Sequence, residues 1–156
     1  MITTGSGEFV YRERKAWGKL PEGWQFDEVA DVAVDSHDRL FVLARGDHPV
    51  VILDREGTYM GAWGEGRFVR PHGLHIGPDD TVYIVDDKGH AVHRYTASGE
   101  PLMSIDCRDN PSKTGYILNR QDTVLIGGGP FNRPTGVALA ADGGLYVSDG
   151  YGNARI

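Results

Sequence analysis

The sequence predicts an all-β protein, and specifically a β-propeller built from four-stranded antiparallel blades. Two observations support this prediction: one strand–turn–strand unit recurs three times, and the 156 residues include 22 glycines and 8 prolines. Glycine and proline at this density indicate many tight turns and therefore many short strands. A recurring unit is typical of repeat architectures, in which neighbouring units bury a shared core.

The three copies of the unit share one pattern, in which an apolar strand, a polar turn and a second, almost continuously apolar strand follow one another. The copies occupy residues 32–43, 73–86 and 136–149. Asp and Gly in the turns favour tight hairpins between strands. In the first two copies, two further strand-like runs follow, so each of these units reaches the four antiparallel strands of a blade.

The repeat also predicts the domain organisation. We expect residues 1–28 to form an N-terminal segment that can supply outer strands of a closing blade, and residues 29–156 to form the blades. A propeller needs at least ~4 blades, whereas this chain accounts for about three, so we interpret it as an incomplete arc truncated at its C-terminus. Its open edges predict a partner, either missing C-terminal blades or, alternatively, a second copy of the chain.

Composition narrows the classes of partner and compartment. The formal net charge is -6, which argues against a nucleic-acid partner because phosphate binding needs clustered Lys and Arg. Cys107 is the single cysteine, so an intrachain disulfide is excluded. The first residues lack the basic and apolar regions of a signal peptide, and no apolar run approaches the ~18 residues needed to span a bilayer. We therefore expect a cytoplasmic protein without a membrane partner.

Three residues stand where the repeat is interrupted or where a loop can face the central channel. Arg45 lies in the stretch 44–49, at a register where the other copies carry aspartate or glycine. His72 enters the inner strand of the second copy, and Tyr151 lies between two glycines after the third. Each also has a structural interpretation. Arg45 could close a turn by pairing with Asp47, His72 could be a buried hydrogen-bonded residue, and Tyr151 could pack between blades.

Two motifs of the third copy resemble NHL repeats: Arg-Pro-x-Gly-Val-Ala at 133–138 and Val-Ser-Asp-Gly-Tyr-x-Asn-x-Arg-Ile at 147–156. Over residues 29–156, the sequence more closely resembles the catalytic core of peptidyl-α-hydroxyglycine α-amidating lyase. This resemblance is strongest at the motifs that contain Arg45, His72 and Tyr151. It implies a six-bladed propeller with a zinc ion on its axis, held by three histidines, and a structural calcium ion nearby.

The resemblance also implies roles for individual residues. His72 would be one zinc ligand, and the backbone carbonyls of Val32 and Leu74 would bind calcium. Tyr151 would deprotonate the substrate hydroxyl, with Arg45 assisting. The other two zinc histidines belong to blades beyond this chain, so we expect the chain to be inactive on its own.

The function implied by the resemblance is that of a metal-dependent lyase. It would cleave the C–N bond of a peptidyl-α-hydroxyglycine, or of a related small α-hydroxy amide, to give an amide and glyoxylate. The first alternative is a non-catalytic NHL propeller that binds a protein or peptide. A second alternative is a metal-dependent propeller hydrolase, which would need a carboxylate-rich axial site drawn from Asp31, Asp86 and Asp87.

Overall fold

The computed structural model describes residues 3–156, and in this part of the chain the protein is all-β, as predicted. Its strands form two four-stranded and two two-stranded sheets, and every neighbouring pair in these sheets is antiparallel. The one helical element among the described residues is a short 3₁₀ turn, η1 (Gln121–Thr123). Within residues 3–156, no helix is long and apolar enough to cross a membrane.

Two complete blades form the body of the molecule. The first contains β3 (Asp31–Val34), β4 (Leu40–Leu43), β5 (Val50–Leu53) and β6 (Tyr59–Trp63). The second contains β7 (Pro71–Ile76), β8 (Val82–Asp86), β9 (Ala91–Tyr95) and β10 (Pro101–Asp106). In each sheet the strands are ordered as they occur in the chain, so each blade is an antiparallel meander. The predicted four-stranded blade is therefore confirmed.

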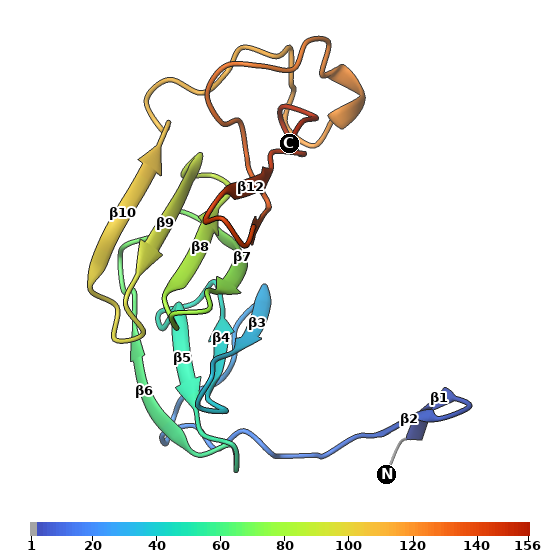
Figure 1. Ribbon diagram of the computed structural model, residues 1–156, viewed down its shortest axis with the longest axis vertical. Helices are drawn as coiled ribbons and strands as arrows, with labels where there is room; N and C mark the ends of the chain where they lie inside the picture. The colour runs from blue at the N-terminus through green and yellow to red at the C-terminus, as the bar shows by residue number, and fades with distance from the viewer. Residues whose placement is uncertain (1–2) are drawn as a thin grey trace.

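The third unit is a two-stranded sheet of β11 (Gly136–Leu139) and β12 (Leu145–Ser148). β3 contacts β7, and β7 contacts β11, so the first strands of the three units lie side by side. Figure 1 shows these strands along one side of the arc, with β6 and β10 along the other. The arrangement is propeller-like and open. A loop-rich connection, residues 107–135, joins β10 to β11.

The hydrophobic core lies between the blades. Phe41 and Leu43 of β4 and Val82 and Ile84 of β8 are completely buried and belong to one cluster. Because side chains alternate along a strand, Val42 points to the opposite face of the first blade. This alternation explains why the second strands of the two complete blades, β4 and β8, are almost continuously apolar: both of their faces are covered.

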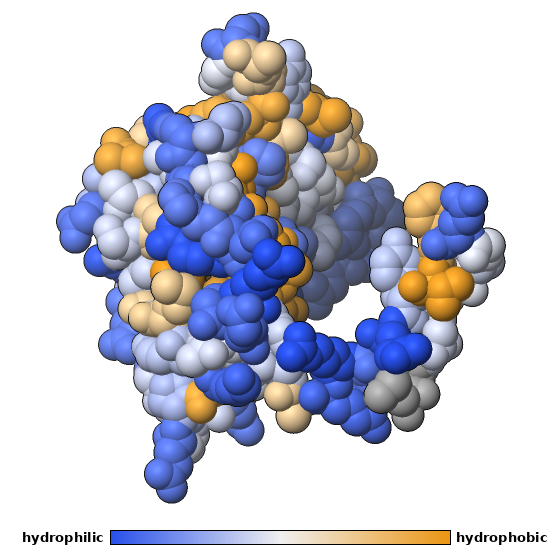
Figure 2. Space-filling view, turned by 60° about the horizontal axis from the view of Figure 1, so that its bottom comes forward, coloured by the Kyte–Doolittle hydropathy of each residue, from blue (hydrophilic) through white to orange (hydrophobic). Residues whose placement is uncertain are grey.

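The N-terminal segment covers that opposite face. Trp17 and Leu20 pack against its cluster of buried side chains, and Lys19 pairs with Thr58. Before this segment, β1 (Thr3–Ser6) and β2 (Phe9–Arg12) form a hairpin that stands apart from the blades and exposes apolar side chains (Figures 1 and 2). The expectation that residues 1–28 supply outer strands to a closing blade stays a prediction, and residues 1–2 lie outside the described part of the chain.

The close approach of two inner strands at Gly73 makes a first testable prediction. A Cβ atom at Gly73 would lie 2.5 Å from the carbonyl oxygen of Thr135, which belongs to the rigid backbone preceding β11. We expect Gly73→Ala to lower the free energy of unfolding by about 1–3 kcal/mol, because it overpacks the junction. Gly61→Ala in β6 is the matched control, since nothing lies within 4 Å of its Cβ position. Equal urea-unfolding midpoints for the two variants would contradict this explanation.

Candidate functional site

The three residues singled out in the sequence lie close together, at the end of the blades where β4 ends and β7 begins. The His72 Nε2 atom lies 3.1 Å from the hydroxyl oxygen of Tyr151. Arg45 Nε donates a hydrogen bond of 3.1 Å to the carbonyl oxygen of Pro71, the residue before His72. One side chain from each of the three repeat units therefore contributes to a continuous group of contacts.

The hydrogen bonds of His72 indicate which ring nitrogen carries the hydrogen. Its Nδ1 atom lies 3.0 Å from the carbonyl oxygen of Thr135, and a carbonyl can only accept, so Nδ1 carries the hydrogen. In this tautomer, Nε2 has a lone pair in the plane of the ring, and this lone pair accepts a hydrogen bond from the Tyr151 hydroxyl. A backbone carbonyl that fixes one ring nitrogen is also the usual arrangement of a metal-ligating histidine. A metal could therefore bind His72 through Nε2, and it would take the place of the hydrogen bond from Tyr151.

Arg45 interacts across the blade boundary. Besides its bond to Pro71, its guanidinium lies 3.7 Å from Glu28, and its side chain is only 19% exposed. No ion pair with Asp47 occurs among residues 3–156, so the turn-closing interpretation of Arg45 is not what the structure shows. The side chain is instead directed toward the strand that carries His72.

The loop that carries Tyr151 is fixed by a buried polar network. Asp149 accepts a hydrogen bond from the backbone of Asn132 and another from the side chain of Asn153, at 3.0 Å and 2.6 Å. The backbone of Gly152 bonds to the carbonyl of Asn132, and a Cβ atom at Gly152 would collide with the Asn132 side chain. Glycine is therefore required beside Tyr151, and the aspartate of the repeat has a structural role.

Arg133 belongs to the same group, although sequence reasoning did not assign it a role. Its guanidinium lies 5.4 Å from the centre of the Tyr151 ring and donates to the hydroxyl of Tyr116 at 2.8 Å. It also pairs with the fully buried Asp87, which in addition binds Arg70. Arg133 occupies the same place before a proline as Arg70 does in the second unit. A residue that recurs in this way is expected from the repeat, so its position alone does not indicate a functional role.

Val32 and Leu74, the two residues expected to offer carbonyl oxygens to calcium, are linked by one carboxylate. Asp31 accepts the backbone N–H of Val32 at 2.8 Å and that of Leu74 at 2.9 Å. These N–H groups point away from the partner strands, and the N–H and C=O of a strand residue point to the same side. Both carbonyl oxygens therefore lie on the open edges of the inner strands β3 and β7.

The carboxylates that a propeller hydrolase would need are engaged inside the protein. Asp86 is fully buried and accepts the backbone N–H groups of Val69, Arg70 and Gly89 at 2.6–2.9 Å. Asp87 forms ion pairs with two guanidinium groups, as described above. With Asp31 bound to two strand N–H groups, all three have protein donors, and the geometry does not favour a carboxylate-rich axial site.

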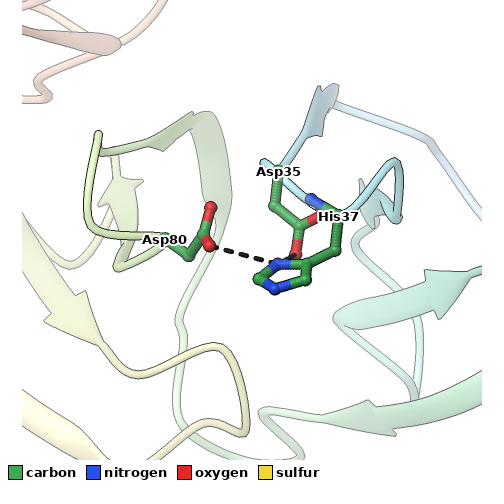
Figure 3. A group of neighbouring side chains, drawn as sticks. All are labelled: Asp35, His37 and Asp80. Carbon is green, nitrogen blue, oxygen red and sulfur yellow. Dashed lines mark hydrogen bonds and ion pairs between the residues drawn. The ribbon is translucent and has the colours of Figure 1, made fainter.

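A second cluster of potential metal ligands lies at the other end of the inner strands, where Asp35, His37 and Asp80 meet (Figure 3). The His37 ring lies 3.2 Å from Asp80, which also accepts the Ser36 hydroxyl at 2.6 Å. Burial raises the pKa of Asp35, but its bonds with Arg39 outweigh this and hold the pKa below its usual value. Since both carboxylates already have donors, we assign this cluster a structural role in joining two hairpin turns.

Two other histidines near the site are structural. Burial lowers the pKa of His90, the Arg133 guanidinium lowers it further, and His90 Nδ1 accepts the backbone N–H of Arg133 at 3.1 Å. Burial also lowers the pKa of His93, which bonds to Ser104 at 2.9 Å. Both rings are therefore neutral at pH 7, and His90 contributes to the site by holding Arg133 in position.

Comparisons with known proteins identify a repeat in the chain. A family model described as "NHL repeat" matches residues 131–156, the third unit and its flanks. The chain thus carries an NHL repeat within a propeller-like fold, as its motifs predicted.

The chain is also similar to amidating enzymes. It is 32% identical over 97 residues to peptidyl-alpha-hydroxyglycine alpha-amidating lyase 1 of Drosophila melanogaster, covering 60% of this chain and 15% of that protein. It is 31% identical over 107 residues to a Caenorhabditis elegans protein named probable peptidyl-alpha-hydroxyglycine alpha-amidating lyase pgal-1, covering 69% of this chain and 27% of that protein. Peptidylglycine alpha-amidating monooxygenase of Rattus norvegicus is 27% identical over 182 residues, covering 97% of this chain and 17% of that protein.

These similarities confirm the predicted resemblance to amidating lyases. The chain spans between 15% and 27% of the lengths of these three relatives.

Proposed function

We propose that Arg45, His72 and Tyr151 form this chain's share of a metal-dependent lyase site. The substrate is a peptidyl-α-hydroxyglycine or a related α-hydroxy amide, and the products are an amide and glyoxylate. The observation that carries the proposal is the contact of 3.1 Å between His72 Nε2 and the Tyr151 hydroxyl. It brings a potential metal ligand and a potential base together from different repeat units, which a purely structural repeat does not require.

In the proposed reaction, Tyr151 as phenolate takes the proton of the substrate hydroxyl. The carbon–oxygen bond becomes a carbonyl, and the carbon–nitrogen bond breaks with its electron pair moving to nitrogen, which takes up a proton. Atoms and charge balance as amide plus glyoxylate. Arg45 supplies guanidinium donors to the negative charge that develops on oxygen or to the substrate carboxylate.

Zinc is the metal that fits this group, since a neutral imidazole nitrogen is among its preferred ligands. When bound, it would supply a Lewis acid that favours ionisation of the substrate hydroxyl. His72 Nε2 would hold it, in place of the hydrogen bond from Tyr151. Zinc needs at least ~3 protein ligands, so we propose that two further histidines come from blades that complete the ring. Those blades belong either to a longer polypeptide or to a second copy, and the chain alone is inactive.

Calcium is proposed as a structural ion between the first two blades. Hard cations bind carbonyl and carboxylate oxygens. The carbonyl oxygens of Val32 and Leu74 face the open edges of β3 and β7, and both residues bond to the same carboxylate, Asp31. A cytoplasmic location is likewise a proposal, supported by the single cysteine, which permits no internal disulfide.

Glyoxylate release tests the proposed function. The assay uses the complete propeller, meaning the polypeptide with the blades that close the ring, loaded with zinc and given an α-hydroxyglycine peptide. We expect glyoxylate and peptide amide in equal amounts, and loss of both when the metal is removed by a chelator. A zinc-loaded protein that binds the peptide without releasing glyoxylate would instead support the non-catalytic binding platform.

A further inference from the structure

A small cavity of about 240 Å³ lies between the N-terminal segment and the loop that contains Arg45. Its lining includes Trp24, Phe26, Asp27, Asp47 and His48. We propose that this cavity binds a basic side chain of a peptide, and specifically the guanidinium group of an arginine. The proposal rests on the aromatic wall of the cavity, on the two carboxylates in its lining and on its volume.

The aromatic part of the wall is held in place. The rings of Trp24 and His48 stack with their centres 3.3 Å apart and their planes at 7°, and Trp24 also meets Tyr59 edge-on at 5.4 Å. Phe26 is 39% exposed and lines the same cavity. The facing sides of Trp24 and His48 are covered by each other, so a cation would meet an outer ring face or the ring of Phe26. Aromatic faces attract cations, and they attract the planar guanidinium by stacking as well.

The charge of the cavity is negative and uncompensated. Asp27 accepts one side-chain hydrogen bond, from Gln25 at 3.1 Å, and neither Asp27 nor Asp47 forms an ion pair among residues 3–156. The nearby cationic side chain, Arg45, pairs instead with Glu28. Two carboxylates beside an aromatic wall provide the acceptors that a guanidinium uses in bidentate hydrogen bonds.

The size of the cavity limits the ligand to one side chain. A cavity of ~150 Å³ holds a benzene molecule, whereas sites for whole small molecules measure roughly 300–1,000 Å³. At about 240 Å³, the present cavity fits a single long side chain. Arginine matches it better than lysine because its flat head can stack and can donate to two carboxylate oxygens at once.

The position of the cavity connects it to the proposed reaction. Ala44 and Gly46, the neighbours of Arg45, line it, while the Arg45 side chain itself reaches toward Pro71. A peptide with its α-hydroxyglycine end at Arg45 could place an upstream arginine in the cavity. The inference that the substrate is a basic peptide therefore rests on the proposed function, whereas binding of arginine by the cavity does not.

Binding is measured with the 156-residue chain itself, by titration with Nα-acetyl-arginine amide while the assigned indole NMR signal of Trp24 is followed. Nα-acetyl-citrulline amide, which has nearly the same shape without the charge, is the comparison ligand. We expect arginine to bind, citrulline to bind at least ~10-fold more weakly, and added salt to weaken arginine binding. Equal affinity for the two ligands, or no change at Trp24, would overturn the proposal.

Matched variants locate the binding. Asp47→Asn should weaken arginine binding by about tenfold, since it removes one charged acceptor. Asp47 makes no hydrogen bond or ion pair through its side chain among residues 3–156, so circular dichroism should show an unchanged fold. Asp109→Asn, another exposed carboxylate far along the chain, should leave the affinity unchanged. Unchanged binding in Asp47→Asn and also in Asp27→Asn would contradict the assigned site.

The outcomes separate this inference from the proposed function. If the chain binds arginine but the complete propeller releases no glyoxylate, the arginine site is supported and the lyase proposal is contradicted. If the complete propeller releases glyoxylate without preferring an upstream arginine, and the chain does not bind arginine amide, the lyase proposal is supported and the arginine site is contradicted.

Discussion

Tyr151→Phe in the complete propeller is expected to lower the rate of glyoxylate release by about 10²–10⁴-fold, the usual contribution of a positioned acid or base. The substitution removes the hydroxyl that lies 3.1 Å from His72 Nε2. It keeps the ring, which meets the His72 ring edge-on at 5.3 Å and lies beneath the Arg133 guanidinium. Stability should therefore change little, while kcat falls. The measurement is steady-state release of glyoxylate by the zinc-loaded protein.

Tyr146→Phe is the matched control for this prediction. Tyr146 lies on the neighbouring strand β12, where it is 60% exposed and takes no part in the group around His72. Its substitution should leave both stability and turnover unchanged. If Tyr151→Phe retained the turnover of Tyr146→Phe, Tyr151 would not be the base.

The second large effect is expected in folding. Asp87 is completely buried and pairs with both Arg70 and Arg133. In Asp87→Ala, the two guanidinium groups lose their common carboxylate, and Arg133, whose side chain is 9% exposed, has little access to water. Removing one partner from a buried ion pair costs about 3–5 kcal/mol, because the remaining charge is uncompensated. We expect a loss of this size in the free energy of unfolding, measured by urea denaturation.

Asp109→Ala serves as the control, since Asp109 is exposed and its loss should leave the unfolding midpoint almost unchanged. A cost below about 1 kcal/mol for Asp87→Ala would mean that the two arginines find other acceptors. Because Arg133 lies over Tyr151, the same variant is also expected to disturb the site. Asp87 thus links the packing of the second and third units to the proposed chemistry.

The blades could be predicted from the sequence because their determinants are local. Turn residues recur at a fixed distance from apolar runs, and a continuously apolar strand such as β8 requires cover on both faces. The grouping of Arg45, His72 and Tyr151 was also predictable, but only because each stands at a known register of the repeat. Arg45 and Tyr151 follow the second strand of their units, and His72 enters the first strand of its unit. In an antiparallel hairpin these positions lie at the same end.

Other features depend on contacts that carry no periodic signal. Trp17 and Leu20 lie in an irregular segment, so nothing in their spacing predicts that they cover the first blade. The link between Ser36 and Asp80 joins two turns that are 44 residues apart. The contact between Arg133 and Tyr151 could not be predicted for a different reason. Arg133 matches the repeat pattern, and only the folded structure brings it next to Tyr151.

Anomalous scattering at the zinc absorption edge, from crystals of the complete propeller, tests whether His72 is a zinc ligand. We expect zinc at Nε2 of His72, beside Tyr151, and loss of that zinc in His72→Ala. His75→Ala, on the same strand and packed against Tyr83, should retain it. Zinc bound instead at Asp35, His37 and Asp80, or zinc retained in full after His72→Ala, would contradict the proposed zinc site.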